Sequence, residues 1–468
     1  MTNRPIAGGP DYHFIGIGGI GMSALAFILA SQGERVSGSD LSENACTQRL
    51  VDAGVQIYRG HAAGNIVGSP QVVCSTAIKP GNPELDAARD RGLTICHRSE
   101  ILAHLMNRRP SIGVSGTHGK TTTSSMLAHL LLRGGLDPTA VIGGEVSSLG
   151  GNARVGNGDY LVAEADESDG SLVNLKPTIG IITNIELDHT DRYQTLDGVV
   201  EVFQTFASQC GLVVGCLDCP TLSERIPVDI SYSIADLPDA DYHARNIRAV
   251  KGGTTADIWE RGQRLGELRL QLLGHHNVCN ALAAIAVARK LGVSFATIAD
   301  AFADFGGARR RFELRGTVEG VEFIDDYAHH PSEIQVTLEA AKSQNRRVVA
   351  IFQPHRYSRI ASLFEDFSRS FDSADEVVVV PTYSAGEPPL PHNQAKSAEA
   401  LADRIRHHSG NPNVEYQPQL DALSDRLPNR LRPRDLVVFL GAGNLNRQIP
   451  SIVDAYRSHL QQSAAVVQ

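Results

Sequence analysis

The sequence predicts an α/β protein with three domains and mainly parallel sheets. Short apolar segments rich in β-branched residues alternate with helix-like segments along almost the whole chain, which is the pattern of βαβ units. The length of 468 residues suggests about three domains at roughly 150 residues each. Glycine-rich and polar clusters directly follow several predicted strands, at the sheet edge where the ligands of α/β proteins bind.

Two breaks in this pattern divide the chain into residues 1–108, 109–313 and 314–468. Pro110 cannot continue the helix-like segment before it, which indicates a linker. The second break follows the run GGARRR at residues 306–311, after which a new alternation of strands and helices begins. We expect each of the three parts to fold as a domain.

The composition excludes several classes of protein. The 43 basic and 52 acidic side chains give a net charge of −9, whereas general nucleic-acid binders carry clustered Lys and Arg. We expect no membrane span, because no apolar run reaches about 18 residues, and residues 1–12 do not resemble a signal peptide. The seven scattered cysteines favour a reducing cytoplasm over a disulfide framework. Cys216 and Cys219 form one CxxC pair without a second pair at zinc spacing, and we interpret them as loop or core residues.

The first predicted strand, at residues 12–17, leads into the GxGxxG motif GIGGIG at residues 16–21. Glycines in such a motif let backbone N–H groups approach a pyrophosphate at a helix N-terminus. Asp40 follows about 20 residues later, at the position of the carboxylate that binds the ribose of a dinucleotide. The motif therefore predicts either a nicotinamide dinucleotide or another pyrophosphate, such as that of a UDP-sugar. Tight helix–sheet packing is its purely structural interpretation.

The strongest motif is SGTHGKTT at residues 115–122, which lies between a predicted strand and a helix-like segment. This context is typical of a phosphate-binding loop, in which Lys120 neutralises the β- and γ-phosphates and the Thr121 hydroxyl binds Mg²⁺. The motif departs from the usual pattern, because Val114 stands at the first glycine position and the glycine follows at Gly116. We predict a site for Mg²⁺ and ATP here.

Two further predicted strands end in acidic or polar clusters. Glu164 and three more acids stand within residues 164–169, directly after an apolar strand. The next strand precedes a polar cluster that ends at His189. Because the carboxyl ends of parallel strands meet at one edge of a sheet, we expect Thr121, Glu164 and His189 to form one metal site.

A helix-like segment begins with HHNVCN at residues 275–280. Asn277 and Asn280 lie about one turn apart, and their amides either bind adenine by paired hydrogen bonds or cap the helix. Three consecutive arginines occupy residues 309–311 at the domain boundary, where they either remain solvated or reach a γ-phosphate.

In the third part, residues 325–331 read DDYAHHP and residues 353–359 read QPHRYSR, each directly after a predicted strand. The two adjacent histidines suggest zinc, but no third ligand follows at a suitable spacing. The clustered cationic and hydrogen-bonding groups suit a carboxylate or phosphate. We therefore expect both loops to line a substrate site rather than to be ordinary polar turns.

In this order, the motifs resemble those of the Mur ligase family over nearly the whole chain. The pairing of DDYAHHP with QPHRYSR is the most specific element and is similar to the alanine-adding branch of the family. The resemblance implies a Rossmann-like UDP-binding domain, a central P-loop ATPase domain and a C-terminal Rossmann-like domain. It also implies a cytoplasmic ATP-dependent ligase that joins L-alanine to the lactyl carboxylate of UDP-N-acetylmuramate through an acyl phosphate, as a step of peptidoglycan precursor synthesis.

The resemblance also implies roles for individual residues. Lys120, Glu164 and His189 are expected to be catalytic, and Thr121, Glu164 and His189 to hold Mg²⁺. The residues expected to bind ATP are Gly116, Thr117, His118, Gly119, Lys120, Thr121, Thr122, Asn277, Asn280, Arg311 and Asp326. The residues expected to bind the UDP-sugar or alanine are Gly18, Gly19, Gly21, Asp40, Ser75, Thr76, Arg98, Tyr327, His329, His355, Arg356 and Arg359.

Other functions are alternatives to this one. A nicotinamide dehydrogenase would use residues 16–21 and Asp40 but would leave residues 115–122 without a role. A nucleotide-gated sensor would bind ATP without turnover. Within the ligase class, a recycling enzyme would attach a ready-made peptide to the same sugar.

Overall fold

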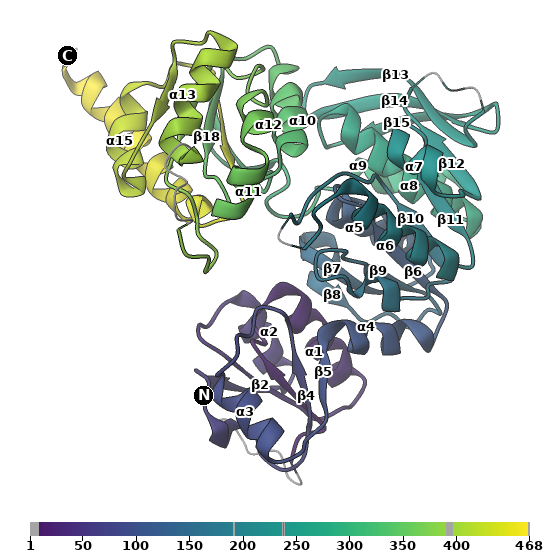
Figure 1. Cartoon of the computed structure of the whole chain (residues 1–468). Helices are drawn as coiled ribbons and strands as arrows, with labels where there is room; N and C mark the ends of the chain where they lie inside the picture. Colours follow the sequence, from purple (N-terminus) through teal and green to yellow (C-terminus); the bar gives the residue numbers. More distant parts are fainter. Residues whose placement is uncertain (1–8, 191, 236, 238, 390–395, 467–468) are drawn as a thin grey trace.

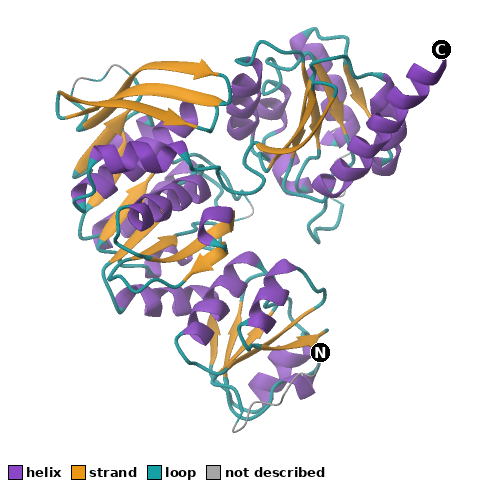
Figure 2. Ribbon diagram, turned by 180° about the vertical axis from the view of Figure 1, so that it is seen from behind, coloured by secondary structure: helices purple, strands orange, loops and turns teal. Residues whose placement is uncertain are grey.

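The computed structural model describes residues 9–190, 192–235, 237, 239–389 and 396–466. Residues 1–8 and 467–468, the two ends of the expected outer domains, lie outside these described residues. The described strands form three separate sheets that follow one another along the chain, each covered by helices (Figures 1 and 2). In both views the three units form an open arc, with the middle unit between the other two.

The N-terminal sheet is parallel and has the order β3-β2-β1-β4-β5. Its strands are β1 (Tyr12–Ile15), β2 (Val36–Asp40), β3 (Gln56–Arg59), β4 (Gln71–Cys74) and β5 (Ile95–His97). Its helices are α1 (Ile20–Ser31), α2 (Ala45–Asp52), α3 (Pro83–Asp90) and α4 (Arg98–Asn107). The prediction of a strand over residues 12–17 is too long by two residues. The strand ends at Ile15 because Gly16 turns the backbone at a φ of +78°.

The middle sheet has the order β15-β14-β13-β12-β11-β10-β6-β9-β7-β8. It is parallel from β13 to β7, and antiparallel strands extend it at both edges. Its strands are β6 (Ser111–Ser115), β7 (Thr139–Val146), β8 (Gly151–Arg154), β9 (Leu161–Glu164), β10 (Ile179–Ile182), β11 (Val213–Cys216), β12 (Ile230–Ser233), β13 (Tyr242–Val250), β14 (Gly253–Glu260) and β15 (Gln263–Leu270). Its helices are α5 (Lys120–Arg133), α6 (Leu196–Gln209), α7 (Pro220–Arg225), α8 (His275–Lys290) and α9 (Phe295–Ala303).

The C-terminal sheet has the order β16-β17-β21-β18-β19-β20 and is parallel except for the β16–β17 hairpin. Its strands are β16 (Glu313–Val318), β17 (Val321–Asp326), β18 (Val348–Phe352), β19 (Glu376–Val379), β20 (Val414–Tyr416) and β21 (Leu436–Leu440). Its helices are α10 (Pro331–Lys342), α11 (Tyr357–Ser362), α12 (Phe364–Ser368), α13 (Ala398–Ser409), α14 (Leu423–Arg426) and α15 (Ile449–Val466). The mixed α/β architecture with mainly parallel sheets confirms the predicted fold class.

The strand and the helix that flank the motif at residues 115–122 are buried in the core of the middle domain. Strand β6 is buried along its whole length between β9 and β10. Helix α5 is buried from Thr121 to Leu131, and α8 packs beside it with a buried run of small and apolar residues. The loop between β6 and α5 is therefore held at both ends by the core, which preorganises it to bind a ligand.

None of the described helices is both long enough and apolar enough to cross a bilayer.

Candidate active site

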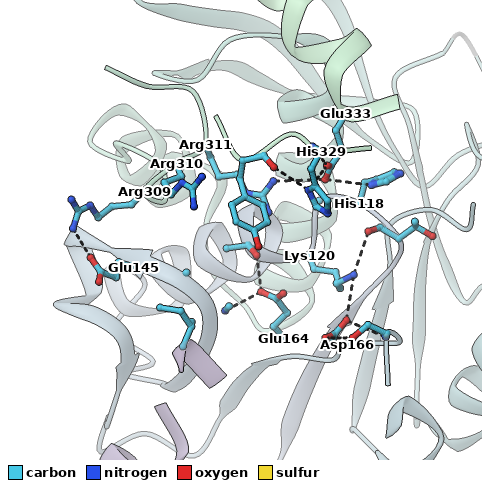
Figure 3. A pocket seen from close by; sticks show the side chains of 18 of the residues that line it. His118, Lys120, Glu145, Glu164, Asp166, Arg309, Arg310, Arg311, His329 and Glu333 are labelled. Carbon is cyan, nitrogen blue, oxygen red and sulfur yellow. Dashed lines mark hydrogen bonds and ion pairs between the residues drawn. The ribbon is translucent and has the colours of Figure 1, made fainter. Parts of the chain in front are cut away.

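A cavity of about 510 Å³ lies where the three domains meet. It is lined by Ile20 of α1, the loop before α5, part of β7, the end of β9 and the loop that follows β10. On the C-terminal side it is lined by residues 309–311 and the loop after β17. Figure 3 shows Lys120, Glu164 and Asp166 on one side, and Arg311, His329 and Glu333 on the other. Groups from separate domains therefore line one space, as a reaction between separately bound substrates requires.

The loop at residues 116–119 requires glycine at both of its glycine positions. Gly116 has a φ of +133°, and a Cβ there would collide with Thr183 Oγ1. Gly119 has a φ of +82°, and a Cβ there would lie 2.5 Å from Asn280 Oδ1. Residue 116 must therefore be glycine, because Thr183 occupies the space that a side chain there would need.

Lys120 begins α5, and its ammonium lies at the centre of a charged network. Nζ donates to Gly116 O at 2.7 Å and to Glu167 Oε2 at 2.8 Å, and lies 3.8 Å from Asp166 Oδ1. Burial alone would lower the pKa of Lys120, but the charges of Glu167 and Asp166 raise it above its ordinary value. The ammonium therefore stays charged, which suits it to neutralise a phosphate.

Glu164 stands at the end of β9 and contacts one side chain and one backbone N–H of the cavity wall. Its Oε2 accepts hydrogen bonds from Thr121 Oγ1 and from Gly143 N, each at 2.9 Å. Burial raises the pKa of Glu164 despite the nearby charge of Lys120. A cation bound here would stabilise the ionised carboxylate and replace the Thr121 hydrogen bond.

His189 lies with Asp166 and Glu167 in a cluster whose potential ligand atoms are all within 4.8 Å of one another. The His189 Nε2 atom is 3.6 Å from Glu167 Oε1, and residue 189 has a φ of +50°. Oxygen ligands with one imidazole suit a hard divalent cation. The structure therefore brings Glu164 to Thr121 and His189 to Glu167, with all but Glu167 lining the central cavity.

A second cavity, of about 470 Å³, adjoins the same loop and is more apolar. Asn277 and Asn280 project into it from α8, and Thr122, Arg311 and Asp326 also line it. Burial raises the pKa of Asp326 to about 6, although Arg311 and backbone donors oppose that effect. An apolar cavity with two amides beside a phosphate-binding loop can hold a nucleotide base.

A third cavity, of about 300 Å³, lies between the N-terminal and middle domains. Gly19, Gly21, Ser75 and Arg98 line it together with Glu164, so one wall is common to this cavity and the central one. Thr76 is exposed in the turn after β4. The structure thus gathers four of the predicted residues at the edge of the first sheet.

Gly18 and Asp40 are in contact inside the glycine loop. The Gly18 N–H donates to Asp40 Oδ2 at 2.8 Å, and Asn44 Nδ2 donates to Gly18 O at 3.1 Å. In this structure the Asp40 carboxylate fixes the conformation of the loop, whereas the dinucleotide interpretation expects it to bind a ribose.

His118, in the loop that we predict to bind phosphate, contacts acidic residues of both the middle and the C-terminal domain. Its ring atoms lie 3.4 Å from Glu186 Oε2 and 3.4 Å from Glu333 Oε1. Burial would lower the pKa of His118, but these two carboxylates raise it to about 9. His118 is therefore charged at neutral pH and attracts both acids.

Of the residues predicted to bind substrate in the C-terminal domain, some lie at the central cavity and two arginines form ion pairs. Tyr327 and His329 line the central cavity, and the His355 ring lies 5.8 Å from that of His329. Arg356 pairs with Glu387 at 3.2 Å.

Arg359 forms an ion pair between the C-terminal and middle domains. Its Nη2 donates to Asp188 Oδ1 at 2.8 Å, and both side chains are buried. Burial would raise the pKa of Asp188, but Arg359 and neighbouring histidines hold it well below its ordinary value. In this structure the Arg359 guanidinium is therefore engaged by a protein carboxylate rather than open to the cavity.

Sequence reasoning missed several residues of the site, above all Glu333. Its carboxylate lies 3.8 Å from Arg311 and 3.1 Å from His329, in addition to its contact with His118. Glu333 is the third residue of α10 and takes part in a capping box with His330. An acid three residues after the N-cap His330, with proline at the first helical position, is the helix-start pattern that could have drawn attention to it.

Comparisons with known proteins agree with this architecture. Residues 11–110 match the model "Mur ligase family, catalytic domain", residues 114–288 match "Mur ligase middle domain", and residues 310–443 match "Mur ligase, glutamate ligase domain". The chain belongs to the Mur ligase family, whose members are ATP-dependent amide-forming ligases.

Named relatives cover nearly the whole chain. It is 57% identical to a UDP-N-acetylmuramate–L-alanine ligase of Synechococcus sp. (strain JA-2-3B'a(2-13)), over 96% of this chain and 93% of the relative. It is 53% identical to the enzyme of the same name from Gloeobacter violaceus, over 97% of both chains. The crystal structure of UDP-N-acetylmuramate-alanine ligase from Thermotoga maritima matches with a TM-score of 0.82 and 32% identity, over 96% of this chain and 99% of the other. A murein peptide ligase from Psychrobacter arcticus matches with a TM-score of 0.70 and 25% identity, over 96% and 99%.

Proposed function

We propose that this chain joins L-alanine to the lactyl carboxylate of UDP-N-acetylmuramate, with conversion of ATP to ADP and phosphate. The function rests on relatives of that activity at more than half identity over nearly the full length. The structural observation that carries it is the central cavity, where the phosphate-binding loop faces groups from both outer domains. We assign the UDP-sugar to residues 1–108, ATP to residues 109–313 and alanine recognition to residues 314–468.

The reaction needs activation because a carboxylate is a poor electrophile. An oxygen of the lactyl carboxylate attacks the γ-phosphorus of ATP, ADP leaves, and an acyl phosphate results. The alanine amine then attacks the acyl carbon, and phosphate leaves as the amide forms. Lys120 lies where it can neutralise the phosphates, and Asn277 and Asn280 supply the amides for adenine.

Thr121, Glu164 and His189 are the residues that we propose to hold Mg²⁺, with Asp166 and Glu167 close by. Their hydroxyl, carboxylate and imidazole donors fit a hard divalent cation, and all three residues line the central cavity together with Asp166. A bound Mg²⁺ would supply positive charge to the transferring phosphoryl group.

The attacking amine must lose a proton, and we propose His329, which lines the central cavity, as the group that accepts it. Burial lowers the pKa of His329, so its imidazole is neutral at pH 7. Its Nδ1 lies 3.0 Å from Tyr327 O and 3.1 Å from Glu333 Oε2, an arrangement that fixes the proton on Nδ1. Nε2 is then left as the proton acceptor.

A cytoplasmic location is part of the proposal. The structure holds the seven cysteines of the sequence as free thiols, which is typical of a reducing compartment. The anionic sugar nucleotide, ATP and alanine are all soluble substrates.

The test is a phosphate-release assay on the purified protein. We expect release that requires UDP-N-acetylmuramate, L-alanine and Mg²⁺ together. Equal release with L-alanine replaced by a tripeptide would favour a recycling ligase, and hydride transfer from a nicotinamide would favour a dehydrogenase. If the protein binds ATP but releases no phosphate with any combination of these substrates, the nucleotide-gated sensor is the remaining interpretation.

A further inference from the structure

Two cysteines from distant parts of the sequence meet in the wall of the nucleotide-base cavity. Cys216 ends β11, and Cys279 lies on α8 between Asn277 and Asn280. Their Sγ atoms are 3.5 Å apart, which is van der Waals contact for two sulfur atoms. Strand β11 and helix α8 pack directly against each other in the middle domain (Figure 1). Both cysteines line the cavity that we assign to the base of ATP.

Among the neighbouring groups, the Asp218 carboxylate contacts Cys216, whose Sγ donates to Asp218 Oδ2 at 3.8 Å. Cys219, the CxxC partner of Cys216 in the sequence, has its Sγ at 3.4 Å from Ile185 N and 3.8 Å from Ile185 O. The Asp218 carboxylate could join the two cysteines in a metal site. However, it already accepts a hydrogen bond from Ile234 N at 2.7 Å and caps the turn after β12. A dithiol pair is thus a better description than a CxxC centre or a metal site.

We propose that Cys216 and Cys279 form a reversible disulfide under peroxide, and that this disulfide weakens nucleotide binding. The proposal rests on the proposed function only in taking this cavity as the site of the ATP base. Disulfides that do form in cytoplasmic proteins are typically transient and catalytic or redox-sensing rather than structural.

The chemistry uses one equivalent of hydrogen peroxide for each disulfide. The Cys279 thiolate attacks a peroxide oxygen, the O–O bond breaks, and a sulfenic acid and hydroxide form. Hydroxide takes a proton to become water. The Cys216 sulfur then attacks the sulfenic sulfur, and a second water leaves as the S–S bond forms. Cys279 reacts first because Cys216 is the more deeply buried of the two.

The rate of this oxidation depends on pH. The hydrogen bond with Cys216 and burial raise the pKa of Cys279 well above its ordinary value. Only the thiolate attacks peroxide, so we expect oxidation to accelerate as the pH rises from 7 to 9. A thiol reductant restores both thiols.

The disulfide changes the cavity because an S–S bond is about 2.05 Å long, so the sulfur atoms must approach each other by more than about 1 Å. Helix α8 is buried and packs tightly, and a shift of Cys279 carries its neighbours Asn277 and Asn280 with it. Asn280 also lies against Gly119 of the phosphate-binding loop. Base recognition and loop geometry are therefore perturbed together. Because the coupling between two such events is mutual, a disulfide that weakens nucleotide binding implies that bound nucleotide disfavours formation of the disulfide.

The experiment compares reduced and peroxide-treated full-length protein. Peptide mass spectrometry is expected to find the Cys216–Cys279 crosslink, and calorimetry with ADP and Mg²⁺ to find a dissociation constant raised about tenfold. Dithiothreitol should reverse both changes, and ADP present during the treatment should slow them. A crosslink of Cys216 to Cys219, the absence of any crosslink, or an unchanged dissociation constant would overturn the proposal.

Variants separate the pair from general oxidative damage. In C279S and C216S, each compared with its own reduced form, peroxide should leave the ADP dissociation constant unchanged. The matched control C96S, altered in the N-terminal domain, should keep the tenfold response. If either pair variant fails to fold, the other still tests the pair. Failure of the reduced wild-type protein to bind ADP would refute the proposed function, whereas binding that oxidation does not alter would refute this inference alone.

Discussion

Replacement of Lys120 by alanine should destabilise the folded protein, because Lys120 pairs with a buried carboxylate. The change removes the partner of the buried Glu167 carboxylate, which lies 2.8 Å from Nζ. Loss of one member of a buried ion pair costs about 3–5 kcal/mol. For a domain of this size, a loss of about 3 kcal/mol lowers the unfolding temperature by roughly 6–12 °C. Removing the carboxylate as well, in K120A/E167A, should restore much of this loss because Glu167 no longer leaves a buried charge, although Asp166 still loses its neighbour at 3.8 Å.

The same replacement should abolish most turnover. One preorganised positive group that acts on the transferring phosphoryl group is worth about 10²–10³-fold in rate. We therefore expect phosphate release to fall by about that factor in K120A and to remain low in K120A/E167A, so that stability recovers while activity does not.

Differential scanning fluorimetry and the phosphate-release assay measure the two effects. The affinity for UDP-N-acetylmuramate should remain within about twofold of wild type, because we place its site in another domain. K176A is the matched control, since Lys176 is exposed in the same domain. Turnover of K120A within tenfold of wild type, or joint loss of ATP and UDP-sugar binding, would refute the reasoning.

Three further predictions follow from individual contacts. R359A should lower the unfolding temperature, because it leaves the buried Asp188 carboxylate without its partner, a loss of about 3–5 kcal/mol; an unchanged unfolding temperature in differential scanning fluorimetry would contradict it. The two carboxylates that raise the pKa of His118 to about 9 stabilise the folded protein while His118 is charged. This stabilisation is complete below pH 6.5 and is lost as the pH rises through 9. The difference in unfolding temperature between wild type and H118N should therefore shrink from pH 6 to pH 9.5, and a constant difference would argue against it. G119A should raise the KM for ATP at least tenfold, because a Cβ would meet Asn280 and the φ is +82°; normal ATP use would show that the loop tolerates a side chain.

Motifs that lie at the ends of parallel strands could be predicted from the sequence. The loop at residues 116–122, Glu164 and His189 each follow a buried strand of the middle sheet, and parallel strands bring such ends to one edge. The position of these residues at one edge of the sheet could therefore be predicted from their place directly after a strand. The roles of these residues in binding remain predictions.

Contacts between distant segments could not be predicted in this way. The pairing of Arg359 with Asp188 depends on how the C-terminal domain docks, and Cys279 meets Cys216 only because α8 packs on β11. The CxxC spacing of Cys216 and Cys219 gives no indication of the contact between Cys216 and Cys279. Such contacts are set by tertiary packing, which no single local pattern encodes.

The central claim is that ATP activates the sugar carboxylate before the amine attacks. UDP-N-acetylmuramate labelled with ¹⁸O in both oxygens of the lactyl carboxylate tests it directly, with the released phosphate analysed by mass spectrometry. Transfer of one labelled oxygen to each phosphate is the predicted result, since the acyl phosphate bridges carbon and phosphorus through that atom. Unlabelled phosphate formed together with the amide would contradict the account.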